Sequence, residues 1–315
     1  MTLCLGRFNR FGMVVGNLEA AMKAYAQVFG IRQFELCRID GRPAALGGFG
    51  SLRLELIEGS AGGDVLGEFF DRRGEGMSHA VFMPDRDDAR EQLAGQAVAL
   101  GMGVEISGDR VTIASRAQLG GLALVAQSAP SPVSGRRSFH YEALLPTQKL
   151  FHIGMVVRDR ELAIGNYQRL LGIDGFLRME LHTDQDLRVW IDGKPALHHA
   201  RTAFGRIGEF ACELMEPLGG DGMYQRFLAA HGEGPQHYFP TILDPADFAA
   251  VRDGLARAGL AVRLEGAIGD AMSYYYLDST PLMGMCIEII VAQRPDWWQS
   301  LGMNAQDAWR VGLDG

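Results

Sequence analysis

The pattern of hydrophobic and polar residues after residue 150 predicts a strand followed by a helix. Residues 151–157 form a short apolar run, which is typical of a buried strand. Residues 159–171 instead repeat apolar side chains at helical spacing, and Gly172 stands where a glycine commonly ends a helix. Three further strands are expected after this helix, at 175–182, 186–192 and 208–216. The pattern therefore indicates a unit of one strand, one helix and three strands, written βαβββ.

The same order of elements begins again at residue 236. An apolar strand is expected over 236–243, followed by a helix over 245–258. Asp244 is a good N-cap for this helix, and Pro245 suits its first turn. Three strands complete the pattern, near 261–265, 272–277 and 284–291. Two βαβββ units thus occupy the second half of the chain.

The first half of the chain repeats the second in sequence. The segment FGMVV at 11–15 matches IGMVV at 153–157, and this offset of 142 residues holds without a gap over about two dozen positions. After a loop of different length, Glu55 aligns with Glu213. We therefore expect an α+β fold of four βαβββ units in two tandem domains. The expected boundaries are an N-terminal domain over 1–127, a linker over 128–148, a C-terminal domain over 149–293 and a Trp-rich tail over 294–315.

Composition and charge narrow the functions of such a fold. The 315 residues are 47% hydrophobic and 22% charged, as in an ordinary globular protein, and the 41 glycines suit many turns between short elements. A formal net charge of −8 disfavours nucleic acids and anionic membranes as partners, and no apolar run is long enough to span a membrane. The four cysteines lack CxxC spacing and are expected to be reduced, buried thiols. The N-terminal residues lack a signal-peptide core, so we expect a cytoplasmic protein. With nucleic acids and membranes disfavoured, the expected partner is a small-molecule substrate.

Two glutamates and two histidines interrupt apolar strands of the second half. Glu213 lies within FACELM and Glu288 within MCIEII, and neither has a Lys or Arg within two residues. A buried carboxylate without a partner is costly, so each needs a nearby positive charge. His152 and His237 have the same character in their own strands. Together the four side chains offer ligands for one divalent cation, with Zn, Ni, Co, Mn and Fe(II) as alternatives.

The equivalent positions of the first half do not form the same set. They are Arg10, Glu55, His79 and Val125, and two of these four residues offer no metal ligand. Arg10 would bring a positive charge to the place of the cation, so Glu55 is expected to pair with Arg10 instead. We therefore expect one metal site per chain, in the C-terminal domain.

Several longer segments carry a family resemblance. They are the two openings FGMVVGNLEAAMKAYAQVFGI and FHIGMVVRDRELAIGNYQRLLGI, the segments ELMEP and HGEGPQH, and the ending YYYLDSTPLMGMCIEII. Up to about residue 293 the chain resembles the vicinal oxygen chelate superfamily of glyoxalase I, methylmalonyl-CoA epimerase, bleomycin-resistance proteins and extradiol dioxygenases. The resemblance implies two tandem glyoxalase-like domains, in each of which two units close into a cupped, incomplete barrel. It also implies that His152, Glu213, His237 and Glu288 are the metal ligands, the set that glyoxalase I-like members use.

The resemblance implies competing activities. The ligand set favours an isomerase, epimerase or lyase of glyoxalase I type that acts on a small carbonyl compound or thioester. In such a reaction the metal would stabilise an enolate or similar oxyanion, and Glu213 or Glu288 would be the base. Chain length and the incomplete first site favour an Fe(II) extradiol-type dioxygenase, in which a His/His/carboxylate triad leaves the position of Glu213 without a ligand. We rank the first activity higher, because a fourth protein ligand removes an open site that a catecholate and dioxygen need. A protein that only binds a small ligand, as resistance members do, is a third alternative.

Three other features remain open at the level of sequence. Tyr274 and Tyr276 share one face of their expected strand, and we assign a catalytic hydrogen bond to Tyr276, with aromatic packing as the alternative. His198 and His199 would point to opposite faces of an extended backbone, so we expect a solvated turn there rather than a metal site. The tail holds three of the four tryptophans and either packs over a domain, forms a lid or contacts a second copy in a homodimer.

Overall fold

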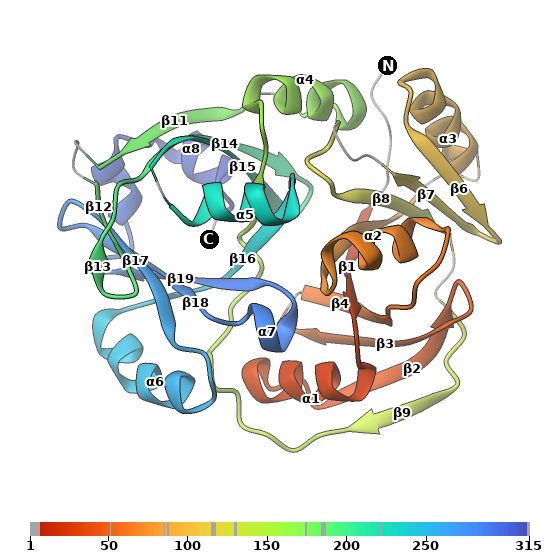
Figure 1. Cartoon of the computed structure of the whole chain (residues 1–315), viewed down its shortest axis with the longest axis horizontal. Helices are drawn as coiled ribbons and strands as arrows, with labels where there is room; N and C mark the ends of the chain where they lie inside the picture. The colour runs from red at the N-terminus through yellow and green to blue at the C-terminus, as the bar shows by residue number, and fades with distance from the viewer. Residues whose placement is uncertain are drawn as a thin grey trace. The chain divides into compact units, whose positions relative to one another are not determined.

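The fold is described here from a computed structural model of the chain (Figure 1). The structure describes residues 7–50, 52–84, 86, 88–114, 118–128, 131–173, 175–183, 187–220 and 222–313. Cys4 lies outside these residues. The chain divides into two compact units, one built mainly of residues before Leu144 and the other mainly of residues from Leu144 onward. The division falls inside the segment 128–148 that was expected to be a linker.

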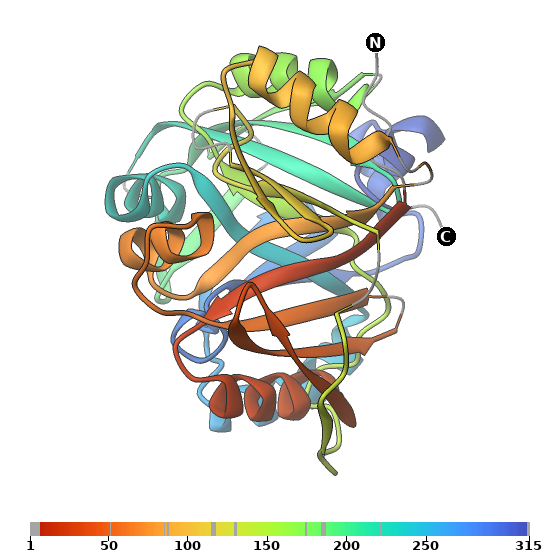
Figure 2. The ribbon, with the colours of Figure 1, turned by 90° about the vertical axis from the view of Figure 1, so that its right-hand side faces the viewer.

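The first unit contains a nine-stranded sheet with the strand order β6-β7-β8-β5-β1-β4-β3-β2-β9. Its strands are β1 (Arg7–Val15), β2 (Gln33–Ile39), β3 (Arg42–Phe49), β4 (Leu52–Glu58), β5 (Gly76–Met83), β6 (Gly103–Ser107), β7 (Arg110–Ala114), β8 (Ala123–Gln127) and β9 (Gly135–Ser138). Its helices are α1 (Leu18–Phe29), α2 (Val65–Arg73) and α3 (Ala89–Ala99). α1 packs on β3 and β4, whereas α3 packs on β6 and β7 at the other end of the strand order (Figure 2). β9 therefore extends the sheet into the segment expected to be a linker.

The second unit contains a ten-stranded sheet with the strand order β11-β14-β15-β10-β16-β19-β18-β17-β12-β13. Its strands are β10 (His152–Val156), β11 (Leu177–His182), β12 (Leu187–Ile191), β13 (Lys194–Pro195), β14 (His199–Ile207), β15 (Phe210–Gly219), β16 (Gly234–Leu243), β17 (Val262–Ile268), β18 (Met272–Leu277) and β19 (Cys286–Ala292). The helical segments from this half are α4 (Arg160–Leu171), α5 (Met223–His231), α6 (Pro245–Arg257), α7 (Thr280–Met283), η1 (Trp297–Leu301) and α8 (Ala305–Arg310). Among the described residues, no helix is long and apolar enough to cross a membrane.

The two sheets repeat the same pairing at their centres. β1 pairs in parallel with β4 and antiparallel with β5, and β10 pairs in the same way with β15 and β16. Gly12 is the register partner of both Glu55 and His79, and Gly154 holds the same position opposite the glutamate and histidine that align with them. The predicted α+β class and the repeated βαβββ plan are confirmed. The repeat in sequence is thus a repeat in hydrogen-bond register.

One predicted strand assignment is wrong. The segment 186–192 was expected to be the second of three strands in its unit, but the strand that lies between β11 and β15 is β14, His199–Ile207. β12 and β13 form an insertion that pairs with β17 instead. The sequence signal of β14 is weak because its buried positions are mostly small residues, such as Ala200, Ala203 and Gly205, which alternate with arginine and threonine.

The ends of the helices follow the expected chemistry. Asp244 caps α6 through a hydrogen bond from the backbone N–H of Asp247, and Pro245 stands at the start of the helix. The glycine that follows α4 in sequence, Gly172, has a φ of 62°, a conformation that glycine adopts at low cost. These residues define where α6 begins and where α4 ends.

The C-terminal tail packs onto the second unit. Trp297 is 4% exposed and belongs to the same hydrophobic cluster as Tyr274 and Ile290, on β18 and β19. α8 contacts β14, while Trp309 on this helix is 40% exposed. Of the alternatives for the tail, packing over a domain is the one that these contacts support.

Candidate metal centre

The four side chains expected to bind a metal meet inside the second unit. They project from the neighbouring strands β15, β10, β16 and β19. Nε2 of His152 lies 3.0 Å from Oε2 of Glu288 and 3.6 Å from Oε2 of Glu213. Nε2 of His237 lies 3.3 Å and 3.2 Å from the same two oxygens, and the two Nε2 atoms are 3.4 Å apart. All four residues are buried, so the donor atoms converge where water has little access.

Three of the four residues have ligand atoms that all lie close to one another. One ligand atom from each of His152, His237 and Glu288 lies within 4.8 Å of the others, a spacing that allows all three to bind one ion. Glu213 lies outside this group of three, although its Oε2 contacts both imidazoles. The structure therefore contains a His/His/Glu triad with a second carboxylate beside it.

The backbone explains how His237 reaches the centre. Its ring lies against Gly154 on the neighbouring strand, where a Cβ atom would fall 1.9 Å from Cε1 of the imidazole. Only glycine leaves room for the ring to cross the strand. Nδ1 of His237 is 2.8 Å from the amide oxygen of Gln236, which accepts a hydrogen bond from it. The lone pair of Nε2 is then directed at the centre, which is the tautomer that a metal-binding histidine needs.

The charges of the centre call for a cation. Burial disfavours an imidazolium at His237, but the negative charge of Glu288 and the hydrogen bond with Glu213 outweigh burial and raise the pKa of His237 to about 9. Burial likewise raises the pKa of Glu288, but the two histidines outweigh it and lower that pKa to about 2. Without a metal, a proton on His237 is needed to balance the buried carboxylate of Glu288. Two imidazoles and two carboxylates fit a divalent cation of mixed nitrogen and oxygen preference.

A cavity opens onto this centre. His152, Glu213 and Glu288 line its floor, and Tyr274 and Tyr276 stand in its wall. The hydroxyl of Tyr276 is 2.9 Å from that of Tyr224, and its ring centroid is 4.8 Å from that of His237. Burial raises the pKa of Tyr276 well above its usual value, so its hydroxyl stays protonated and can donate a hydrogen bond.

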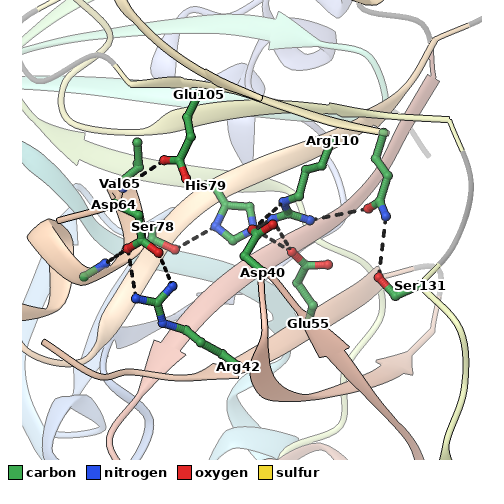
Figure 3. Close-up of polar contacts among 12 residues, drawn as sticks. Asp40, Arg42, Glu55, Asp64, Val65, Ser78, His79, Glu105, Arg110 and Ser131 are labelled. Atoms are coloured by element: carbon green, nitrogen blue, oxygen red, sulfur yellow. Dashed lines mark hydrogen bonds and ion pairs between the residues drawn. The ribbon is translucent and has the colours of Figure 1, made fainter. Parts of the chain in front are cut away.

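The equivalent place in the first unit is filled by two arginines, of which Figure 3 shows Arg110 beside Glu55 and His79. Arg10 forms an ion pair with Glu55, as predicted. Arg110, which the sequence reasoning missed, places Nη2 2.8 Å from Oε1 of Glu55, and Nε2 of His79 is 2.6 Å from the same oxygen. Although burial raises the pKa of Glu55, the Arg110 charge and the other partners hold it well below its usual value. Val125 is buried on β8 and offers no ligand. The guanidinium groups thus balance the charge of Glu55, whereas the centre of the second unit has His152 in the place of Arg10.

The sequence reasoning placed one further pair of residues wrongly. His198 is not in a solvated turn: it is 5% exposed, immediately before β14, and its ring centroid lies 5.2 Å from that of Tyr224. Burial lowers the pKa of His198 to about 4, so its imidazole is neutral. His199 is part of β14, and its Nε2 lies 2.8 Å from Glu180. Neither residue joins the four-residue centre.

Residues 151–276 match the family described as Glyoxalase/Bleomycin resistance protein/Dioxygenase superfamily. The fold is similar to that of a triple mutant of 4-hydroxymandelate synthase from Streptomyces coelicolor, with a TM-score of 0.64 and 13% identity over 91% of this chain and 92% of that one. It is also similar to a halotolerant catechol dioxygenase, with a TM-score of 0.50 and 12% identity over 92% of this chain and 87% of that one. No curated protein matches the sequence. At such identities the structural likeness establishes the fold alone.

Proposed function

The chain belongs, through residues 151–276, to the glyoxalase/bleomycin resistance/dioxygenase superfamily, and we propose that it is a divalent-metal-dependent enzyme whose site lies in its second half. The proposed reaction removes a proton beside a carbonyl group and leads to isomerisation, epimerisation or elimination on a small carbonyl compound or thioester. The observation that carries this proposal is the meeting of His152, Glu213, His237 and Glu288 at one buried centre, three of which, all but His237, line the floor of one cavity. Two carboxylates at one centre provide both a metal ligand and a base.

Each residue of the centre has its own role in the proposed reaction. His152, His237 and Glu288 would hold the metal, which when bound supplies Lewis acidity that stabilises negative charge on a substrate oxygen. Glu213 lines the cavity next to these three residues, and we assign the role of base to its carboxylate. Tyr276 would donate a hydrogen bond to a second substrate oxygen, because its hydroxyl is protonated and stands in the cavity wall. The remaining wall excludes water, which strengthens each of these interactions.

A second candidate function is favoured by the same triad. A His/His/Glu group with a carboxylate outside it is also the ligand set expected of an Fe(II) extradiol-type dioxygenase. In that reading Glu213 is not a ligand, and the open positions would take a catechol and dioxygen. The two functions therefore assign different roles to one residue, Glu213. Glu213 is an essential base in the first and an accessory group in the second.

Metal analysis and a substitution at Glu213 test the proposal. Protein purified without added metal should contain about one divalent ion per chain, and Glu288→Ala should abolish it. The surface variant Glu180→Ala is the control and should keep the ion. Chain without any bound metal, even after dialysis against Zn(II), Mn(II) or Fe(II), would refute both enzymatic functions.

The variant Glu213→Gln then separates the two functions. In the proposed function it keeps the metal but loses exchange of substrate α-hydrogens with deuterated water, followed by NMR over a panel of small carbonyl compounds. Uptake of oxygen on catechols by the Fe(II)-loaded protein, retained in Glu213→Gln, would overturn the proposed function in favour of the dioxygenase.

A further inference from the structure

The wall of the cavity above the candidate metal centre is apolar. Outside the three floor residues it is formed mainly by aromatic and aliphatic side chains, including Phe204, Phe239, Ile290, Trp297 and Leu301. No lysine or arginine is among the described residues that line it. Such a wall favours aromatic or aliphatic groups, because their burial is stabilising and offers ring-to-ring contacts. It offers no cationic partner to a phosphate, a sulfate or a second carboxylate of a substrate.

The charge of the loaded centre leads to the same conclusion. The residues that would surround the ion include two carboxylate side chains, Glu213 and Glu288, and the described residues that line the cavity include no lysine or arginine. The lining therefore offers an anion no cationic side chain to pair with. A substrate that entered with a charged group would lose the hydration of that group without gaining an ionic partner, which is costly in an apolar site.

Thr202 adds a hydroxyl group to this wall, beside those of Tyr224, Tyr274 and Tyr276. Its side chain is 0% exposed and lines the cavity from β14, and its Oγ1 has no hydrogen-bond partner among the described residues. A buried hydroxyl left without a partner destabilises the free protein, so its presence needs a reason. A polar group of a bound ligand would provide the missing partner. Thr241 is equally buried and also unpartnered, but it does not line the cavity.

Resting on the proposed function, we infer that the substrate is an uncharged, largely apolar small molecule, with adjacent oxygens at the metal end and one further polar group that hydrogen-bonds to the hydroxyl of Thr202. The apolar wall receives the body of the molecule. Thr202 is then a specificity-determining residue, because it rewards a hydrogen-bonding substituent at one position of that body. Thioesters of charged carriers fit the cavity only if the charged part stays outside it.

Binding to the zinc-loaded protein tests the charge of the ligand. Zinc does not change oxidation state, so two matched probes with adjacent oxygens can be compared by calorimetry without turnover: 4-methylcatechol and 3,4-dihydroxybenzoate, which carries a carboxylate at the position of the methyl group. We expect the neutral probe to bind at least about tenfold more tightly. Equal or tighter binding of the anion would overturn the inference. Loss of zinc itself would instead refute the proposed function, so the two failures are distinguishable.

Two arginine variants sharpen this test. Met303 lies at the cavity and is half-buried, so Met303→Arg should place a cation at the wall without burying it, and should reduce or reverse the preference for the neutral probe. Leu197 is 70% exposed and is not a lining residue, so Leu197→Arg is the matched control and should leave the preference unchanged. An equal change in both variants would mean that the charge of the whole surface decides, and would overturn the argument from the wall.

A pair of valine variants tests Thr202. We expect 4-(hydroxymethyl)catechol to bind the zinc-loaded protein several-fold more tightly than 4-methylcatechol, and Thr202→Val to remove that advantage of about five- to tenfold. Thr241→Val should keep it. Both variants replace an unpartnered hydroxyl by a methyl group, so neither should lower the melting temperature. An advantage that survives in Thr202→Val, or that is absent in the parent protein, would overturn the role of Thr202.

Discussion

Alanine at position 154 would place a carbon atom against the imidazole of His237. The two residues are register partners on β10 and β16, and a Cβ at Gly154 would lie 1.9 Å from Cε1 of the ring. The ring cannot simply turn away, because His237 is fully buried and Gln236 holds its Nδ1. Gly154→Ala must therefore displace the histidine from the centre. The first unit contains a matched control, since a Cβ at Gly12 would lie 1.9 Å from Cε1 of His79.

The size of the effect follows from this distance. Ordinary van der Waals contact begins at 3.4 Å, so the ring must retreat by about 1.5 Å. Overpacking of this kind costs about 1–3 kcal/mol of the free energy of unfolding, which a folded chain of this size tolerates. Ligand distances in metal sites are held to about 0.2 Å, so the same shift should weaken metal binding by at least about 100-fold.

Two measurements check this prediction on both variants. Urea unfolding in the presence of EDTA should show a similar loss of stability for Gly154→Ala and Gly12→Ala. Competition with a chromophoric chelator should show weakened metal binding for Gly154→Ala only, because the first unit holds arginine where the metal would sit. Metal affinity within about twofold of the parent protein in Gly154→Ala would refute the assignment of His237 as a ligand.

Three further predictions concern the first unit and the thiols. Arg10→Ala breaks a buried ion pair with Glu55 and should cost about 3–5 kcal/mol in urea unfolding with no change in metal content, and a loss below about 1 kcal/mol would contradict it. Burial lowers the pKa of His79 from 6.5. The Arg110 charge and the other partners hold the pKa of Glu55 well below 4.5 despite its burial. Both groups therefore bind more protons in the unfolded chain than in the folded one. The free energy of unfolding should therefore fall as the pH drops below 6.5 and fall further below 4.5; a flat profile between pH 7 and pH 4 would contradict this. Burial raises the pKa of Cys212 to about 12, and the other two described cysteines are also buried, so an aromatic disulfide reagent at about pH 8 should modify at most one of the four thiols before unfolding.

The sequence allowed the repeated core of the fold to be predicted, and the reason is burial. The central strands are apolar on both faces, so they stand out as short hydrophobic runs, and they recur at a fixed offset. β14 could not be found in this way, because its buried residues are small and alternate with polar ones. β9 was missed for a related reason: Gly135–Ser138 is a mostly exposed edge strand with almost no apolar signal, and only its pairing with β2 makes it a strand.

The candidate site was predictable where a single charged or polar residue interrupts an otherwise apolar strand. A glutamate inside an apolar strand, such as Glu213, is conspicuous without any coordinates. Arg110 was missed because it lies 55 residues from its partner Glu55 and its strand does not adjoin the partner's strand in the sheet. Thr202 was missed because a threonine in a strand is unremarkable. What marks it is the lack of a hydrogen-bond partner, which no sequence pattern records.

The two centres are alternative solutions to one electrostatic problem. Each sheet places a glutamate opposite a central glycine, at Glu55 and at Glu213, and buries it beside a histidine that lies over that glycine. Such a carboxylate needs positive charge. In the first unit two arginine side chains supply it permanently, which closes the centre to exchangeable ligands. In the second unit His152 takes the place of Arg10, and the proposed divalent ion would supply the charge. The exchange of Arg10 for His152 is therefore one of the differences that would leave the second centre open to a metal and a substrate, while the first is held by its own side chains.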